Sequence, residues 1–526
     1  MLYTKLAWRG MVTAPHHLAA GAGQDILKAG GTAIEACVAM AAALAVVYPH
    51  MTSMGGDGFW LIHEPNGEIK AIDACGPAAR RADLALYEEH ETIPWRGPLA
   101  ANTVAGTVDG WRVALQDDHK LELARLLAPA IALAEDGVAI TPGGAELAST
   151  KGPALRRLPG AYAAIFEPKG QPLRTGERLF QPQLAQTLRR LATDGLESFY
   201  HGATGALIAA DLAALGSPVS MADLIAYQAQ PVTPLRAEIK GATLFNLPPP
   251  TQGVASLTIL ALFDRLAHGQ MADEFPHIHS LVEATKQAFL WRDTHCGDPA
   301  YMRESAQALL DDSARLDHMA RRIDPQRALT WPQPPAWGDT TWFGAADARG
   351  QVVSCIQSTY FEFGAGVVLP RTGIIWQNRG SSFRLADTGW NALKPGRKPF
   401  HTLNPALARF DDGRVMAYGT MGGEGQPQTQ AAVFTRYGYY GMDLQEAVSA
   451  PRWLLGRAWG EQSTTLKLEN RFSPQLVNAL RQAGHDVEIL PAWSSLMGHA
   501  GAIVRHQDGL LEGAGDPRSD GAVAAF

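Results

Sequence analysis

The segment that most constrains the fold of this chain is a run of apolar residues at positions 33–47. Thr32 and Glu35 stand at the spacing of a capping box. In this motif each of the two side chains accepts a hydrogen bond from the backbone N–H of the other residue, at the start of a helix. The helix that follows would be apolar on nearly every side, and such a helix is buried all round. The longest apolar run, 36–47, is shorter than the ~20 residues that span a bilayer. We therefore expect this helix to lie between layers of secondary structure.

The remaining patterns predict a layered α+β globule rather than an all-helical or all-strand protein. A helix over 15–29 should end at Gly30 and Gly31, and a hairpin over 58–73 should turn at residues 64–67. The region 104–302 has a mostly helical pattern, including a long amphipathic helix over 276–293. Beyond it, we expect strands and helices to alternate. The strands are expected at 341–346, 352–357, 414–419 and 502–505, and the helices at 429–437, 443–449 and 474–483.

Charge and cysteine content exclude several classes of function. The 526 residues carry 45 Lys and Arg against 52 Asp and Glu, a net charge of -7 without a basic block, which argues against binding nucleic acid or anionic membrane. Four widely spaced cysteines without a CxxC pair favour a reducing compartment. The first residues include no apolar signal core. We expect a cytoplasmic protein with neither a nucleic-acid nor a membrane partner.

Two further kinds of site receive little support. His277 and His279 lie two apart on a helix and would not share a face, so we expect no metal site and no cofactor. The glycine loops 55–58 and 422–425 match neither a dinucleotide fingerprint nor a P-loop. Each could be a tight turn with close backbone approach, or an oxyanion hole built from bare backbone N–H groups.

The pair Thr340-Thr341 is the strongest candidate for chemistry. It follows a proline-rich stretch, residues 320–339, which has the pattern of an extended connector, and it opens the strand-rich half of the chain. A threonine becomes a nucleophile when its own free α-amino group acts as the base, which requires cleavage of the chain directly before it. An exposed connector ending at Asp339 and leading into a buried strand would suit such a cleavage.

Seven motifs in order along nearly the whole chain resemble the γ-glutamyltransferase family of N-terminal-nucleophile hydrolases. They are Ala19 through Phe59, Leu247 to Gly253, Thr340-Thr341, Phe363 to Gly366, Met421-Gly422-Gly423, Tyr440 through Arg452, and Gly515 to Ser519. Within that family, the chain resembles the oxamate amidohydrolase subgroup in length and in the segments 376–380 and 400–404. That subgroup acts in purine catabolism.

The resemblance implies a four-layer αββα sandwich made as one self-cleaving zymogen. Autocatalytic cleavage between Asp339 and Thr340 would give a large subunit, 1–339, and a small catalytic subunit, 340–526, in one intertwined globule. Thr340 would be the nucleophile, the N–H groups of Gly422 and Gly423 would hold the oxyanion, and Ser358 would be a second hydroxyl beside the nucleophile. Homo-oligomers are possible.

This chain departs from the family's pattern in its expected substrate pocket. Cys75 stands where the family has an arginine for the glutamate α-carboxylate, and Ser382 where it has an aspartate for the α-amino group. Tyr360 replaces an asparagine, and His401 and Thr402 replace a pair of serines. Because a buried unpaired substrate charge costs several kcal/mol, these losses should abolish selection for a γ-glutamyl group.

The basic residues that remain suit a small acid amide without an α-amino group, such as oxamate. Arg379 is our candidate for the carboxylate clamp, with Arg384, Arg397 and His401 nearby in the pocket. One alternative is a glutathione hydrolase or γ-glutamyltransferase, in which Arg80 or Arg81 replaces the missing arginine. Another is an uncleaved, inactive binding protein with the same fold.

Overall fold

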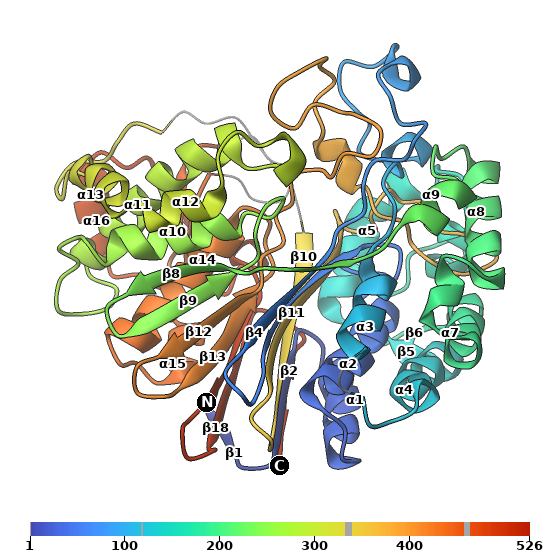
Figure 1. Cartoon of the computed structure of the whole chain (residues 1–526), viewed down its shortest axis with the longest axis horizontal. Coiled ribbons are helices and arrows are strands. Elements are labelled where there is room, and N and C mark those ends of the chain that lie inside the picture. The colour runs from blue at the N-terminus through green and yellow to red at the C-terminus, as the bar shows by residue number, and fades with distance from the viewer. Residues whose placement is uncertain (1, 117–118, 332–338, 457–462) are drawn as a thin grey trace.

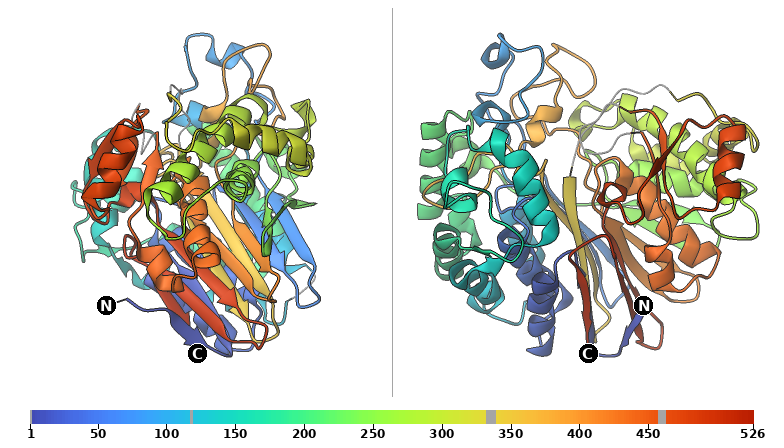
Figure 2. Two further views of the ribbon diagram at one scale, coloured as in Figure 1. Left: turned by 90° about the vertical axis from the view of Figure 1, so that its left-hand side faces the viewer. Right: turned by 180° about the vertical axis from the view of Figure 1, so that it is seen from behind.

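The computed structural model describes residues 2–116, 119–331, 339–456 and 463–526. Two seven-stranded sheets pack face to face, and a layer of helices covers the outer face of each (Figure 1). The view from behind shows the same four layers, with the sheets between the helical layers (Figure 2, right). The expected αββα sandwich is confirmed.

The first sheet holds strands from distant parts of the chain, all paired antiparallel. From edge to edge it contains β19 (Ala522–Ala525), β2 (Gly10–Ala14), β10 (Asp339–Asp347), β11 (Val352–Tyr360), β3 (Asp57–His63), β4 (Ile69–Ala74) and β7 (Gln230–Val232). The strand that carries Thr340 is thus in the interior of the sheet, with neighbours on both sides.

The second sheet is also antiparallel throughout. It contains β1 (Lys5–Ala7), β18 (Leu511–Gly515), β17 (Ala500–Arg505), β13 (Val415–Thr420), β12 (Ala406–Phe410), β9 (Ala242–Asn246) and β8 (Leu235–Ile239). Both sheets combine strands from before and after residue 339, so the two halves of the chain share one fold.

The contact between the sheets is built around a tryptophan next to the expected nucleophile. Trp342 of β10 is 2% exposed and points from the first sheet into the second. A Cβ added to Gly419 of β13 or Gly501 of β17 would lie 2.1 or 2.5 Å from its ring. The indole Nε1 donates to Ser354 Oγ at 2.9 Å, which satisfies its polar atom. Glycines at these two positions therefore let the sheets close around the indole.

The helical layers follow from the sequence patterns described above. The capping box of Thr32 and Glu35 is present, and every residue of α2 is buried, as predicted. The first layer contains α1 (His17–Lys28), α2 (Ala33–Val47), α3 (Thr107–Leu115), α4 (Leu123–Asp136), α5 (Pro142–Leu155), α6 (Tyr162–Phe166), α7 (Pro182–Asp194), α8 (Ala203–Leu215) and α9 (Met221–Ala226). The second contains α10 (Gly253–Phe263), α11 (Phe275–His295), α12 (Ala306–Asp311), α13 (Ser313–Arg321), α14 (Gly425–Phe434), α15 (Leu444–Ser449) and α16 (Pro474–Gln482).

The region 104–302 is mostly helical, as expected, since it contains α3 to α11. It also contributes the strands β7, β8 and β9, which the sequence analysis did not predict. The helix over 276–293 exists as α11 but is buried on most of its surface, because its polar residues find partners inside. Lys286 with Glu283, at 2.6 Å, is one such pair.

The connector expected at 320–339 begins later than predicted, because α13 continues to Arg321. Residues 332–338 of it lie outside the described residues.

A three-stranded sheet of β14 (Trp453–Leu455), β15 (Leu466–Glu469) and β16 (Val487–Leu490) lies beside the second helical layer, and β5 (Val138–Ala139) pairs with β6 (Arg178–Leu179). Among the helices that the structure describes, none has both the length and the apolar character needed to cross a lipid bilayer.

Candidate active site

Thr340 lies at the start of β10, opposite an irregularity in the neighbouring strand. Asp339 pairs with Tyr360 and Thr341 with Gln357, so the single residue Thr340 faces two residues of β11. Such a bulge redirects side chains next to the extra residue. Thr340 is fully buried, and its Oγ1 accepts a hydrogen bond from Gln426 Nε2 at 3.1 Å. The nucleophile candidate is therefore held by a side chain from the second half of the chain.

Ser358 is one of the two residues that Thr340 faces. Its Oγ accepts a hydrogen bond from Tyr360 N at 2.7 Å, and both side chains are buried. Tyr360 has a φ of 83°, a left-handed conformation that is rare for a bulky residue. The structure thus brings Ser358 and Tyr360, both predicted site residues, beside Thr340.

The two glycine loops have different surroundings. Gly422 and Gly423 have φ of 119° and 54° and lead directly into α14, with Gly422 partly exposed. The carbonyl of Gly423 accepts from Gln252 Nε2 at 2.8 Å, which fixes the loop from one side. By contrast, a Cβ on Gly56 would lie 2.1 Å from Ser358 O, so that glycine serves close backbone approach. Only the loop at 422–423 remains a candidate for the oxyanion hole.

Arg379 is a fully buried guanidinium next to this centre. It begins a short 3₁₀ turn (Arg379–Ser382) and lies 3.5 Å from the ring centroid of Tyr360. Its Nη2 donates to Thr402 Oγ1 at 3.0 Å and its Nη1 to Phe400 O at 3.5 Å, whereas its Nε has no partner. Burial lowers the pKa of Arg379 to about 10, opposed by Tyr360 and Asp57, so it stays charged at neutral pH.

No carboxylate among the described residues lies within ion-pairing distance of the Arg379 guanidinium. A buried charge without an opposite charge is costly, and proteins normally pair it. A bound anion would supply the opposite charge that this buried guanidinium lacks. Arg379 thus keeps one buried N–H, on Nε, without an acceptor among the described protein groups.

Asp57 of β3 pairs with Ser358 of β11, and sequence analysis did not identify it as a site residue. Its carboxylate accepts from Gly76 N (3.0 Å), Gly106 N (3.2 Å), Gln377 Nε2 (3.0 Å) and His401 Nε2 (3.0 Å). Burial raises its pKa to about 7, against the effect of these bonds and of Arg379. The only signal in the sequence was an acidic residue between glycines at the start of a buried strand.

His401 and Cys75 lie around Asp57. Burial, and then the charges of Arg379 and Lys398, lower the pKa of His401 well below its ordinary value, so the imidazole is neutral. Burial also raises the pKa of the Cys75 thiol well above its usual range. Cys75 is therefore an unreactive thiol. It supplies no positive charge at the position where the family has an arginine.

The other predicted pocket residues do not all gather here. Ser382 is partly exposed, and its Oγ donates to Phe400 O at 3.4 Å, the same carbonyl that Arg379 contacts. Arg397 instead lies over Tyr301, at 4.3 Å, and Arg384 lies over Trp390, at 4.6 Å. These two arginines therefore contact the rings of Tyr301 and Trp390, whereas Arg379 contacts the ring of Tyr360.

Neither Arg80 nor Arg81 takes the place of the missing arginine. The Arg80 side chain is 66% exposed beside Asp223, and Arg81 Nε donates to Pro218 O at 3.2 Å. Both partners belong to the segment around α9. The alternative that moved one of these arginines into the pocket is therefore wrong.

Among the residues that the structure describes, two clusters of side chains have the ligand types of a metal site. One is Asp57, Cys75 and His401, and the other is His279, Glu283 and His485. In the first, the Asp57 oxygens already accept four hydrogen bonds and Arg379 is close, which opposes a cation. In the second, Lys286 binds Glu283 at 2.6 Å and the two imidazoles hydrogen-bond each other at 2.9 Å. Both clusters are satisfied by protein groups.

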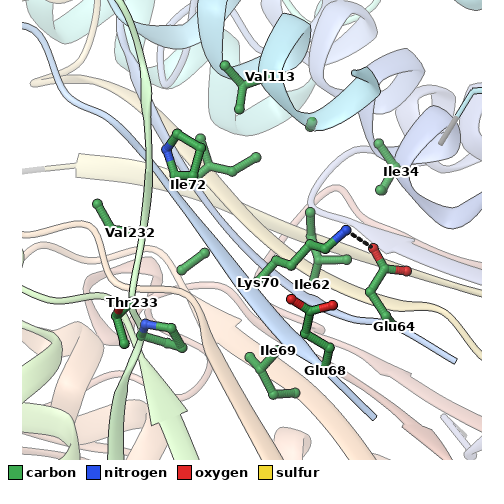
Figure 3. Close-up of a pocket in the computed structure, with 14 residues that line it drawn as sticks. Ile34, Ile62, Glu64, Glu68, Ile69, Lys70, Ile72, Val113, Val232 and Thr233 are labelled. Carbon is green, nitrogen blue, oxygen red and sulfur yellow. Dashed lines mark ion pairs between the residues drawn. The ribbon is translucent and has the colours of Figure 1, made fainter. Parts of the chain in front are cut away.

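A cavity of about 500 Å³ lies away from these residues, beside the hairpin of β3 and β4 (Figure 3). Aliphatic side chains such as Ile34, Ile62 and Val232 line it, and the ion pair between Lys70 and Glu64 borders it. It contains none of the predicted site residues. Thr340, Ser358, Tyr360 and Arg379 thus all lie outside this cavity.

Comparison with known proteins gives matches along the whole chain. The sequence model of the family described as gamma-glutamyltranspeptidase matches residues 19–526. The oxamate amidohydrolase proenzyme of Klebsiella pneumoniae subsp. pneumoniae is 52% identical, over 99% of each chain. The glutathione hydrolase proenzyme of Escherichia coli is 30% identical, over 98% of this chain and 91% of its own. The crystal structure of cephalosporin acylase from Bacillus halodurans superposes with a TM-score of 0.92 at 32% identity, over 100% of this chain and 97% of its own.

Proposed function

The chain belongs to the γ-glutamyltranspeptidase family, and from this premise we propose that it is a self-processing amidohydrolase that converts oxamate to oxalate and ammonia. Cleavage between Asp339 and Thr340 would free the α-amino group of Thr340. The mature protein would then consist of subunits 1–339 and 340–526. Both sheets combine strands from the two parts, which supports a product that stays together after cleavage.

Thr340 Oγ1 attacks the amide carbonyl carbon, and the hydroxyl proton passes to its own α-amino group. An unperturbed α-amino group has a pKa of about 7.7–8.0, which suits a base near neutral pH. The tetrahedral oxyanion is held by the N–H groups of Gly422 and Gly423. The amino group returns the proton to the leaving nitrogen as the C–N bond breaks, and ammonia departs. Water then attacks the acyl-threonine ester, which releases oxalate and restores Thr340.

The observation that carries the choice of substrate is the buried, charged Arg379 with a free Nε beside Tyr360. Tyr360, whose ring Arg379 contacts, pairs with Asp339, the residue directly before Thr340, so a carboxylate bound by this guanidinium would lie near the proposed nucleophile. In oxamate the carboxylate and the amide share one C–C bond, so the acid fits a compact site. The curated relative named oxamate amidohydrolase proenzyme, at 52% identity, supports the same substrate.

The experiment compares oxamate with oxamide, which has an amide in place of the carboxylate, in the cleaved enzyme. We expect kcat/KM for ammonia release to be about 100-fold or more higher for oxamate, because a site built for a charged partner rejects the neutral analogue. In Arg379→Met this preference should vanish. Arg80→Met, which replaces an exposed arginine beside Asp223, is the matched control and should keep it.

Two results would replace this proposal. Faster hydrolysis of glutathione than of oxamate would favour the glutathione hydrolase alternative, which the Escherichia coli relative suggests. A chain that stays at full length on a denaturing gel, and releases no ammonia, would favour an inactive binding protein. An unchanged preference for oxamate in Arg379→Met would retain the activity and reject Arg379 as the clamp.

We place the enzyme in the cytoplasm, in the breakdown of purine nitrogen, and give it no nucleic-acid or membrane partner. All four cysteines are buried and unpaired, which agrees with a reducing compartment. The proposed chemistry uses only Thr340, backbone N–H groups and water, so it calls for neither a metal nor a cofactor. Association with further copies of the chain is compatible with this proposal.

A further inference from the structure

Two motifs that the proposed chemistry leaves without a role meet inside the fold. They are the segments 450–452 and 515–519, which are more than 60 residues apart along the chain. Arg452 Nη2 donates a hydrogen bond to one carboxylate oxygen of Asp516, and Arg518 Nη1 donates to the other oxygen at 3.1 Å. All three side chains are completely buried. The motifs therefore form one ionic cluster in the protein interior.

Glu469, the last residue of β15, completes this cluster. Its two carboxylate oxygens accept from Arg518 Nε at 2.8 Å and Nη2 at 2.5 Å, and one also accepts from Arg452 N at 3.1 Å. Positive and negative groups thus alternate from Arg452 through Asp516 and Arg518 to Glu469. Burying four charges has a large desolvation cost, and well-packed apolar residues stabilise an interior at least as well. Stability alone is a weak reason for such a cluster.

The cluster fixes the backbone of one short segment, residues 497–500. Arg452 Nη1 donates to the carbonyl of Met497 at 3.1 Å and to that of Gly498 at 2.8 Å. Asp516 accepts from Ala500 N at 2.6 Å. Because a guanidinium is planar and its donors point in fixed directions, these bonds determine the position of the segment and not only its charge environment.

That segment lies directly against the loop of Gly422. Gly498 has a φ of +79°, and a Cβ on it would lie 2.3 Å from Met421 O. A Cβ on Gly422 would lie 3.4 Å from Gly498 Cα, and Met421 N donates to His499 O at 3.2 Å. Backbone therefore packs on backbone, without an intervening side chain that could absorb a shift.

From these contacts we infer that Arg452, Asp516, Arg518 and Glu469 position the oxyanion hole. The cluster holds segment 497–500, and that segment supports the loop whose N–H groups are proposed to hold the oxyanion. The inference rests on the proposed role of Gly422 and Gly423. Oxyanion donors act only when they are held in place before the reaction, so a displacement of a fraction of an ångström is costly. The four residues are positioning residues, because none of them touches substrate.

The test uses Arg452→Lys, which keeps the positive charge beside Asp516 but cannot reach both carbonyl oxygens. We expect kcat for oxamate, per cleaved enzyme, to fall about 10- to 100-fold while KM stays within about twofold, because the donors act on the transition state. Arg471→Lys is the matched control. Arg471 also contacts Glu469, at 3.3 Å, but bonds to Ser449 O rather than to segment 497–500. This control should change kcat by less than about twofold.

A second variant separates this inference from the proposed function. Gly498→Ala leaves the ionic cluster intact and pushes directly on Met421, so it should also lower kcat. If Gly498→Ala lowers kcat but Arg452→Lys reduces only the melting temperature, the oxyanion role stands and the positioning role is wrong. If neither variant changes kcat, both are wrong. Should Arg452→Lys fail to mature, Asp516→Asn removes the partner charge of Arg452 and must give the same fall in kcat.

Discussion

Gln426 Nε2 donates a hydrogen bond of 3.1 Å to Thr340 Oγ1. Gln426 is in the first turn of α14, three residues after Gly423, and its Oε1 accepts from Asn404 N at 3.2 Å. One side chain thus joins the expected nucleophile to the helix that follows the oxyanion loop. The amide group is neutral, so it orients the hydroxyl without changing the charge of the site.

Replacement of Gln426 by alanine should lower kcat about tenfold with little change in KM, since the hydroxyl would lose its fixed direction. Gln428→Ala is the control, because Gln428 lies on the same helix but bonds to Glu424 O and Leu455 O. Ammonia release by the cleaved fraction of each variant measures the effect. Equal losses in the two variants would show that helix α14, rather than the bond to Thr340, is responsible.

Thr340→Ala should remain one chain of 56.4 kDa on a denaturing gel, because no hydroxyl is present to attack the preceding carbonyl. Thr340→Ser should cleave, although more slowly than the parent. Circular dichroism of both variants checks that the fold is retained. Cleavage of the alanine variant at the parent's rate would exclude Thr340 as the agent of processing.

Asp57→Asn should change how stability depends on pH. The pKa of Asp57 is raised to about 7, above the unfolded value of 3.8, so the folded state holds this proton more tightly. The parent therefore loses stability as the pH rises from about 4 to about 7, by at most about 4 kcal/mol at 1.36 kcal/mol per pH unit, and no further above pH 7. The amide that replaces the carboxyl group in the variant cannot ionise, so this contribution is absent there.

The measurement is the free energy of unfolding in urea for the parent and for Asp57→Asn between about pH 4 and about pH 8. The difference, parent minus variant, should fall with increasing pH and then level off. A difference that is constant across this range would mean that Asp57 titrates normally.

Two glycine substitutions should have opposite effects on stability. Gly419→Ala would place a Cβ 2.1 Å from the Trp342 ring, so we expect a loss of at least about 1–3 kcal/mol from overpacking between the sheets. Gly21→Ala lies in α1 with no atom within 4 Å of the new Cβ, and should gain up to about 1 kcal/mol from helix propensity. Thermal unfolding of both variants gives the comparison, and stabilisation by Gly419→Ala would contradict the packing described for Trp342.

Much of the fold could be predicted from local patterns. The capping box of Thr32 and Glu35, the hairpin turn before β4 and the N-cap of Ser473 at α16 all follow from interactions within a few residues. Strands β7 to β9 could not, because their identity depends on partners far along the chain; β9 pairs with β12, more than 150 residues away. The buried character of α11 was missed for a similar reason, since its polar residues pair only after folding.

The candidate active site also contains both residues that the sequence identifies and residues that it does not. Thr340, Gly422 and Gly423 could be proposed from sequence because cleavage before a threonine, and bare backbone donors, each require a particular residue type. Asp57 could not, since its importance comes from Gly76, Gly106, Gln377 and His401 converging on one carboxylate. The sequence also grouped Arg397 with Arg379, but it could not show that Arg397 lies over Tyr301 and Arg379 over Tyr360.

The sequence by itself therefore determined the layered architecture, the family and the residue that is proposed to react. Local hydrogen bonding, apolar periodicity and the fixed order of motifs are sufficient for these conclusions. Only the tertiary structure decided which charges meet. It left Arg379 without an anion and joined Arg452 to Asp516, because electrostatic interactions depend on distances in space that separation along the chain does not reveal.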